Sequence, residues 1–218
     1  WSNKAGNVFR EFGLKKGDRI FIYMPRCPEW YFAFLGAIKL GAIAGPLFES
    51  YRESAIRERI LDSGAQYLVT TPKLLQQVPE ECLLQLKGIF LVGEMVKESG
   101  KNIDFKLRME KAESDLEITW VDREDGMLLQ YTSGSAGKPK GVLHVHNAMV
   151  QHYVTGKRVL DLHEEDVFWC TADPGWMTGI SYGIFAPWLN GAANVVYGGK
   201  FSPHSWYRVI EELGITVW

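Results

Sequence analysis

Residues 130–141 read Gln-Tyr-Thr-Ser-Gly-Ser-Ala-Gly-Lys-Pro-Lys-Gly, and the rest of the chain is interpreted outward from this stretch. It holds three Ser or Thr hydroxyls, three glycines and two lysines. Glycine reaches positive φ at no steric cost, so successive backbone N–H groups can converge on one concave point. The hydroxyls add donors, and Lys138 and Lys140 add positive charge beside a phosphate. The stretch predicts a phosphate-binding loop. A solvated hairpin turn is the simpler alternative, but a turn needs fewer lysines and hydroxyls.

The flanking residues predict that this loop joins two strands. An apolar run, Gly126-Met-Leu-Leu, leads into it, and Val142 and Leu143 follow it. The loop is not a Walker A motif, which has four residues between its glycines and Ser or Thr after its lysine. Here two residues separate the glycines, and Pro139 follows the lysine.

Residues 131–141 resemble the phosphate loop of the adenylate-forming superfamily, which includes acyl-CoA synthetases, peptide-synthetase adenylation domains and luciferases. In that family the loop covers the β- and γ-phosphates of ATP. The family usually has Thr where this chain has Ala136, so one hydroxyl donor is missing. The resemblance implies ATP phosphate contacts for Thr132, Ser133, Gly134, Ser135, Ala136, Gly137, Lys138 and Lys140.

Residues 171–179, Thr-Ala-Asp-Pro-Gly-Trp-Met-Thr-Gly, form the second informative stretch. Its indole follows a Pro-Gly turn beyond a predicted strand end, where open α/β sheets bind ligands. Such an indole can wall a small apolar pocket, or it can simply fill the core. The segment resembles the Ala-Asp-x-Gly-Trp-x-Thr-Gly signature of acetyl-CoA synthetases and their short- to medium-chain relatives. The resemblance implies that Trp176, Met177 and Thr178 line the acyl-substrate pocket.

A third resemblance concerns residues 41–48 and 54–61, which are similar to the family segment that ends beside the CoA nucleotide. Family enzymes often have Phe-Gly-Gly at that point, whereas this chain has Phe-Glu-Ser at 48–50. The resemblance assigns a CoA contact to Phe48. Considered without it, these residues are a strand end.

Strands alternating with helices predict an α/β fold with layered, mainly parallel sheets flanked by helices. The pattern predicts helices over 2–12, 28–40, 51–63, 72–77, 105–113, 147–160, 182–189 and 202–213, and strands over 19–24, 43–48, 66–70, 88–92, 167–171 and 193–197. In helix 51–63, Ile56, Ile60 and Leu61 are expected on the buried face. The opposite, solvated face is expected to carry Arg52, Arg57, Glu58 and Arg59.

The composition is ordinary for a soluble globular protein, with 46% hydrophobic and 23% charged residues among 218. The formal net charge of −2 and the lack of a basic cluster exclude nucleic-acid binding through a basic face. Three widely spaced cysteines predict free thiols in a reducing compartment, the cytoplasm. The most apolar span, 30–48, is interrupted by Lys39 and Pro46, so a buried helix and a strand are expected there, not a membrane span.

Two other motifs suggest different kinds of site. Gly179-Ile-Ser-Tyr-Gly183 matches the G-x-S-x-G elbow of hydrolases, which needs an acid and then a histidine after the serine. No Asp or Glu lies between Ser181 and His204, the only later histidine, which argues against a hydrolase. His144 and His146 could bring two imidazoles to one side of a strand. No carboxylate or cysteine accompanies them at ligand spacing, so a structural role is favoured and no metal site is expected in the chain.

The resemblance covers nearly the whole chain and implies part of the N-terminal domain of an acetyl-CoA-synthetase-like enzyme. Residues 1–17 and 161–218 would belong to one α/β subdomain, and 18–160 would form a second that carries the phosphate loop. The chain begins without Met and ends within a predicted strand, so we expect a piece of a larger protein. The C-terminal lid domain of the family, with its adenylation lysine, is absent, so the piece alone is expected to be inactive.

The implied reaction converts a carboxylate, ATP and CoA, with Mg²⁺, to acyl-CoA, AMP and pyrophosphate through an acyl-adenylate. The expected partner is a small carboxylate such as acetate, with no nucleic acid and no membrane. A medium-chain acyl-CoA synthetase is the nearest alternative. A non-catalytic, truncated module that binds nucleotide or a partner is the alternative from another class.

Overall fold

The computed structural model describes residues 1–94, 96–132 and 137–218. Contacts within the chain divide it into two compact units, Trp1–His146 and Asn147–Trp218, which we call unit 1 and unit 2. No helix in the described ranges is long and apolar enough to cross a membrane.

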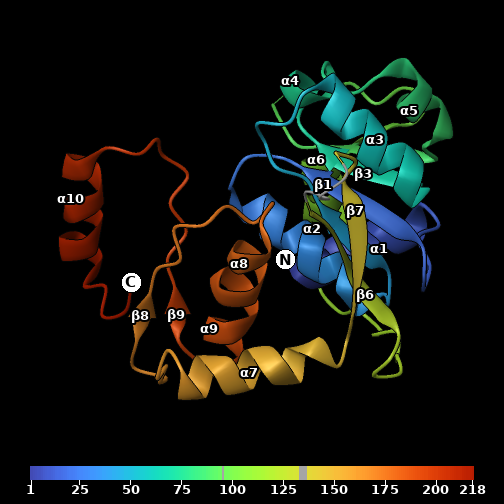
Figure 1. Cartoon of the computed structure of the whole chain (residues 1–218). Coiled ribbons are helices and arrows are strands. Elements are labelled where there is room, and N and C mark those ends of the chain that lie inside the picture. The colour runs from blue at the N-terminus through green and yellow to red at the C-terminus, as the bar shows by residue number, and fades with distance from the viewer. Residues whose placement is uncertain (95, 133–136) are drawn as a thin grey trace. The chain divides into compact units, whose positions relative to one another are not determined.

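Unit 1 is built on a seven-stranded sheet in the order β5-β4-β3-β1-β2-β6-β7 (Figure 1). Its strands are β1 (Arg19–Tyr23), β2 (Ile43–Pro46), β3 (Tyr67–Thr70), β4 (Gly88–Leu91), β5 (Asn102–Asp104), β6 (Gly126–Thr132) and β7 (Lys140–Val145). The neighbouring strands from β5 to β6 pair in parallel, and only β6 and β7 pair antiparallel. The predicted layered, mainly parallel α/β fold is therefore confirmed.

Helices cover both faces of this sheet (Figure 1). They are α1 (Ser2–Glu11), α2 (Pro28–Lys39), α3 (Glu53–Ser63), α4 (Pro72–Leu75), α5 (Glu80–Gln85) and α6 (Phe105–Lys111). On one face, α3, α4 and α5 bury Ile56, Leu74 and Cys82 in a cluster with strand residues such as Phe21. On the other face, α1 packs against α2 and α6.

The end of helix α3 was predicted correctly, but the helix starts two residues later than predicted and buries a different face. It ends at Ser63, and Gly64 follows with φ of 63°, as expected for a helix C-terminus. Arg59, however, is only 8% exposed, whereas Leu61 is 37% exposed. The reason is helical spacing: Arg59 follows Ile56 by three residues and shares its side, but Leu61 follows it by five and does not.

Unit 2 is smaller. It contains α7 (Ala148–Arg158), β8 (Val167–Phe168), α8 (Met177–Ile180), the π-helical η1 (Ser181–Phe185), α9 (Ala186–Leu189), β9 (Ala193–Asn194) and α10 (Pro203–Leu213). Strands β8 and β9 pair in parallel, and Val217 adds an isolated parallel bridge to Phe168. One buried cluster of this unit contains Leu162, Phe168 and Ala186, and Ile180, Ile184 and Phe185 are buried as well.

Several boundary predictions in unit 2 were wrong. The helix predicted to start at 182 begins at Met177, and both predicted strands are two residues long. The Asn147 side chain makes no cap hydrogen bond to α7, and Leu162, in the segment after this helix, is fully buried in a cluster with Phe168. Ser202 does cap α10, because its hydroxyl accepts a hydrogen bond from the Ser205 amide at 3.1 Å.

Two short elements of unit 1, α5 and β5, were not predicted, because neither has a clear apolar period. The family-based division into 1–17 with 161–218 and 18–160 stays a prediction. Units 1 and 2 are defined by contacts within this chain alone.

Candidate functional site

The predicted phosphate loop joins β6 and β7 at the end of a hairpin. Thr132 is the last residue of β6 and lies opposite Lys140, the first residue of β7. Both are exposed, as is Lys138. The predicted contacts at Ser133, Gly134, Ser135 and Ala136 lie outside the described residues. The described part of the loop thus brings two lysines and one hydroxyl together at the hairpin end.

The hairpin end lies at the carboxyl edge of the parallel part of the sheet. Strands β2 and β6 are parallel neighbours, with Ala44 opposite Leu128, so both end at the same edge. Phe48 follows the end of β2 by two residues and is half-buried. The predicted CoA residue and the predicted phosphate loop are therefore neighbours at this edge.

Helix α3 flanks the hairpin. A cavity of about 320 Å³ is lined by Arg57, Glu58 and Asp62 of this helix and by Lys138 and Pro139 of the loop. Exposed carboxylates thus line one cavity with a loop lysine, and the cavity is open and polar enough for water to enter.

Tyr131, the residue before Thr132, is hydrogen-bonded to a side chain of α3. Its hydroxyl donates a hydrogen bond to the carboxylate of Asp62 at 2.6 Å, and its ring is 6% exposed. Burial and this hydrogen bond raise the pKa of Tyr131 well above its ordinary value of 10.0, so the phenol stays a donor at neutral pH. Neither Tyr131 nor Asp62 was predicted from the sequence to be a site residue.

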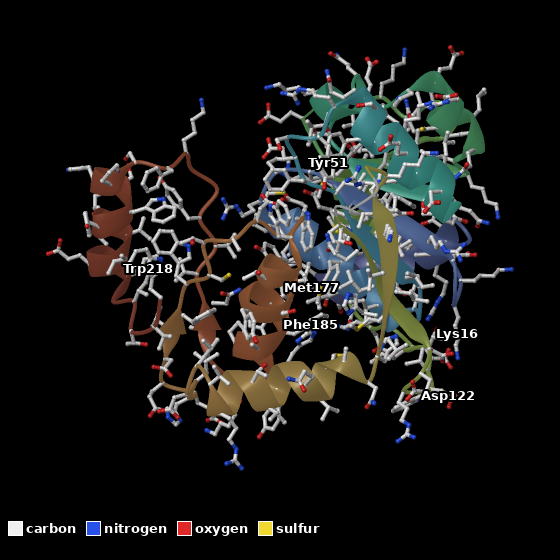
Figure 2. The ribbon with its side chains drawn as sticks, in the orientation of Figure 1. Lys16, Tyr51, Asp122, Met177, Phe185 and Trp218 are labelled. Atoms are coloured by element: carbon white, nitrogen blue, oxygen red, sulfur yellow. The ribbon has the colours of Figure 1, made fainter. Side chains whose placement is uncertain are left out.

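Arg59 lies beside the same tyrosine. Its guanidinium carbon is 4.2 Å from the ring centroid of Tyr51 and 5.7 Å from that of Tyr131. Figure 2 labels Tyr51, which precedes α3. The ring of Tyr51 is in turn 5.9 Å from that of Phe48. In the sequence, only the i, i+3 spacing of Arg59 and Asp62 on a helix indicates that these two side chains lie on the same side of α3.

In unit 2, the segment predicted to bind the acid forms a tight turn followed by a helix. The side-chain carboxylate of Asp173 accepts a hydrogen bond from the Gly175 amide at 2.7 Å. The backbone carbonyl of Asp173 accepts a second one from the Trp176 amide at 2.9 Å. Met177, labelled in Figure 2, starts α8. The turn therefore sets the direction in which Trp176 enters the helix.

Gly179 makes this turn possible. A Cβ atom at this position would lie 2.1 Å from the Asp173 carbonyl oxygen and 2.8 Å from the Pro174 nitrogen. Both are backbone atoms that cannot move without displacing the turn. Glycine is thus needed here for close approach of the backbone.

A cavity of about 450 Å³, lined mainly by apolar residues, lies on one side of this segment in unit 2. Of the three predicted acid-pocket residues, Thr178 lines this cavity, together with Cys170 and Tyr182. Trp176 and Met177 are not among its lining residues, and the Trp176 side chain is 57% exposed.

The hydrolase interpretation is excluded by the local structure. A nucleophile elbow places its serine on a sharp turn between a strand and a helix. Ser181 instead follows α8 directly, lies in the π-helical turn η1 and is 6% exposed.

His144 lies on β7, His146 directly follows this strand, and both are partly buried. Burial lowers the pKa of both imidazoles, so the neutral forms are favoured. Within the described ranges, no group of three His, Cys, Asp or Glu side chains is arranged to hold a metal ion.

Comparison with known proteins assigns the family. The model of the family described as AMP-binding enzyme matches residues 1–218. The chain therefore belongs to the AMP-binding enzyme family, and the predicted membership in the adenylate-forming superfamily is confirmed.

Two curated relatives are acetyl-coenzyme A synthetases. That of Bacillus subtilis (strain 168) is 61% identical over 219 residues, which cover 100% of this chain and 38% of that enzyme. That of Alcanivorax borkumensis is 38% identical over 213 residues, which cover 90% of this chain and 33% of that enzyme. The predicted similarity to acetyl-CoA synthetases is confirmed, and the chain spans less than half the length of these relatives.

Two solved structures of related enzymes have the same fold as this chain. An acyl-CoA synthetase from Brucella canis superposes with a TM-score of 0.90 at 30% identity, over 99% of this chain and 39% of that one. An anthranilate CoA ligase, AuaEII, in complex with anthranoyl-AMP gives a TM-score of 0.89 at 28% identity, over 99% of this chain and 42% of that one.

Proposed function

We propose that the intact protein containing this chain is an AMP-forming acetate–CoA ligase. The observation that carries the proposal is the 61% identity to the Bacillus subtilis acetyl-coenzyme A synthetase along the whole of this chain. In the reaction, an oxygen of the carboxylate attacks the α-phosphorus of ATP, and the bond from that phosphorus to pyrophosphate breaks. The thiolate of CoA then attacks the acyl carbon, and AMP leaves.

The β6–β7 hairpin would hold the phosphates of ATP in the first step. Lys138 and Lys140 would compensate phosphate charge, and Thr132 and Gly137 would donate hydrogen bonds through hydroxyl and amide groups. The same role is proposed for Ser133, Gly134, Ser135 and Ala136. Mg²⁺, if used, would be held chiefly by phosphate oxygens, since Mg²⁺ often binds through substrate phosphates with few protein ligands.

The acid would be held by Trp176, Met177 and Thr178. Their place after the Asp173 turn supports this role, because the turn and Gly179 fix where the indole begins. Side chains of this size leave room for a short acyl chain, and the size of residue 177 would set its length. CoA would contact Phe48.

The chain alone is proposed to be inactive, because it covers only 38% of the Bacillus subtilis enzyme to which it is 61% identical. Acid-dependent formation of AMP by residues 1–218 alone would contradict this. We place the intact enzyme in the cytoplasm, with a small carboxylate as its partner.

The family resemblance supports a division of the intact protein into 1–17 with 161–218 and 18–160. Contacts in this chain group α1 with α2 and α6. Hydrogen exchange on the intact protein tests the division: we expect α1 to open together with residues 161–218. If α1 opens with α2, residues 1–17 belong to the other subdomain.

Carboxylate-dependent ATP–pyrophosphate exchange by the intact protein tests the function. We expect exchange with acetate, less with propionate and butyrate, and little with longer acids. Exchange that rises toward longer acids would assign a medium-chain acyl-CoA synthetase. Binding of ATP without exchange with any acid would assign a non-catalytic module.

A further inference from the structure

The start of the phosphate loop is tied to α3 by one partly buried hydrogen bond. Tyr131 donates to the Asp62 carboxylate at 2.6 Å, which is short for a phenol hydroxyl. Tyr131 directly precedes Thr132, so any shift of the phenol shifts the first residue of the loop. The bond therefore fixes the position where β6 ends relative to α3.

The hairpin is built to accommodate this ring. Gly141 lies opposite Tyr131 in the β6–β7 register, and a Cβ atom at Gly141 would lie 3.2 Å from the Tyr131 ring. A larger residue on β7 would therefore compete with the ring for this space. The pairing lets the tyrosine lie across the hairpin and reach α3.

Arg59 holds the ring from another direction. The side chain is 8% exposed, and its only hydrogen bond among the described residues is to the Ala55 carbonyl at 2.8 Å. Its Nε is buried without a partner, and no ion pair joins it to a carboxylate in the described ranges. The faces of Tyr51 and Tyr131 thus supply the negative potential around a permanent charge.

Helix α3 also reaches the far end of the loop. Asp62, the acceptor for Tyr131, lines one cavity with Lys138 and Pro139. One carboxylate therefore lies beside both ends of the loop. A change in its bond to Tyr131 would alter the spacing of Thr132 and Lys138, the two ends that would grip the phosphates.

We propose that Tyr131 is a positioning residue for ATP, held by Asp62 and Arg59 so that the phosphate loop starts at a fixed distance from α3. The inference rests on the proposed function of the loop. Tyr131 does not touch the reacting atoms. It acts through Thr132 and Lys138.

Binding of MgATP to the intact protein by titration calorimetry tests this, with Tyr131→Phe as the variant. Removal of the hydroxyl leaves Asp62 solvated, because that carboxylate is exposed. We expect the Kd for MgATP to rise about tenfold, since hydrogen bonds to charged groups are among the stronger ones.

The matched control is Tyr67→Phe. Tyr67 is a similarly buried tyrosine on β3, and its hydroxyl donates to the Phe12 carbonyl at 3.3 Å. The Kd of the Tyr67→Phe variant for MgATP should change by less than about twofold.

A double-mutant cycle identifies the partner. We expect Asp62→Ala to weaken MgATP binding, and the double variant with Tyr131→Phe to bind no more than about twofold more weakly than the weaker single variant. Full additivity of the two changes would overturn the inference. So would wild-type affinity in Tyr131→Phe, or an equal loss in Tyr67→Phe.

The exchange assay separates this inference from the proposed function. Wild-type protein that binds MgATP but exchanges with no acid would overturn the ligase activity, while the Kd of Tyr131→Phe would still decide the role of Tyr131. Wild-type protein that does not bind MgATP would overturn both.

Discussion

Unit 1 and unit 2 bury apolar side chains to very different extents. In unit 1, helices cover both faces of a seven-stranded sheet, and β1 to β4 are almost wholly buried. In unit 2, the sheet has two strands, and α10 has no fully buried residue although its apolar side chains are grouped on one face. Phe201, Tyr207 and Trp218 are each more than 60% exposed. The comparison indicates that unit 1 carries its own core, whereas unit 2 depends on a small one.

The largest effect is expected when the units are separated. Residues 1–146 alone should unfold cooperatively in urea, because the buried clusters of unit 1 lie within these residues. Residues 147–218 alone should show no cooperative transition, since β8 and β9 are two residues long each and α10 has no fully buried residue. Circular dichroism during urea titration measures both. A sharp transition for 147–218 would contradict the comparison.

A core truncation should give the next largest effect. Phe90 is fully buried, and its ring centroid lies 4.8 Å from that of Phe9 and 5.7 Å from that of Phe105. Phe90→Ala should lower the free energy of unfolding by about 3–5 kcal/mol through lost burial and a cavity.

Phe201→Ala is the matched change in unit 2. Phe201 is 66% exposed and touches Trp206 edge-on at 4.6 Å between centroids. The cost should be about 1 kcal/mol or less. Urea titration of both variants measures the difference, and equal costs would show that unit 2 has a core as tight as that of unit 1.

Two glycines of one helical segment provide a third test. Gly179→Ala forces a Cβ atom against the Asp173 carbonyl and should cost about 2–3 kcal/mol, with displacement of the Trp176 turn. Gly183→Ala is the control, because the nearest atoms to its Cβ are those of Cys170 at 3.5 and 3.6 Å, an ordinary contact. It should be neutral or slightly stabilising. Thermal unfolding and tryptophan fluorescence report on both, and a neutral Gly179→Ala would contradict the tight turn.

The smallest effect expected is a pH dependence confined to unit 1. The folded pKa of His144 and His146 lies below the ordinary value of 6.5, so the unfolded chain binds more protons at acidic pH. Stability from these groups is therefore present above pH 6.5 and is lost as pH falls through the folded values. The free energy of unfolding of residues 1–146 should fall between pH 7.5 and 5, and less so in His144→Gln/His146→Gln. An unchanged slope in that variant would assign the pH dependence to other groups.

The predictions from sequence were most accurate where short-range signals agree. Gly64 and the Ser202-Pro203 pair mark helix ends through local backbone chemistry, and both helices end or start there. The strand–loop–strand pattern around residues 130–141 was likewise local. Phe48 and the β6–β7 hairpin are neighbours because β2 and β6 pair in parallel. This pairing follows from the alternation of strands and helices, not from either motif alone.

What was missed depends on contacts between distant residues. The charge of Arg59 favours a solvated face, and only the approach of Tyr51 and Tyr131 explains its burial. Asp62 is an ordinary exposed acid until β6 brings Tyr131 within 2.6 Å. The strands of unit 2 are short because only two residues of β8 pair with β9. The apolar runs 167–171 and 193–197 do not show where this pairing stops.

We propose a division of labour, in which unit 1 would hold the phosphates of ATP and unit 2 would select the acid. Acid profiles of ATP–pyrophosphate exchange by the intact protein test it most directly, with Lys138→Ala for unit 1 and Met177→Ala for unit 2. Lys106→Ala, an exposed lysine on α6, is the control and should leave exchange unchanged.

We predict that Lys138→Ala lowers exchange with every acid by the same factor, about 100-fold, because a preorganised charge on the phosphates is lost. Met177→Ala should instead shift the preference toward longer acids, since truncation enlarges the pocket by a few methylene groups. A changed acid preference in Lys138→Ala, or a uniform loss in Met177→Ala, would contradict the account.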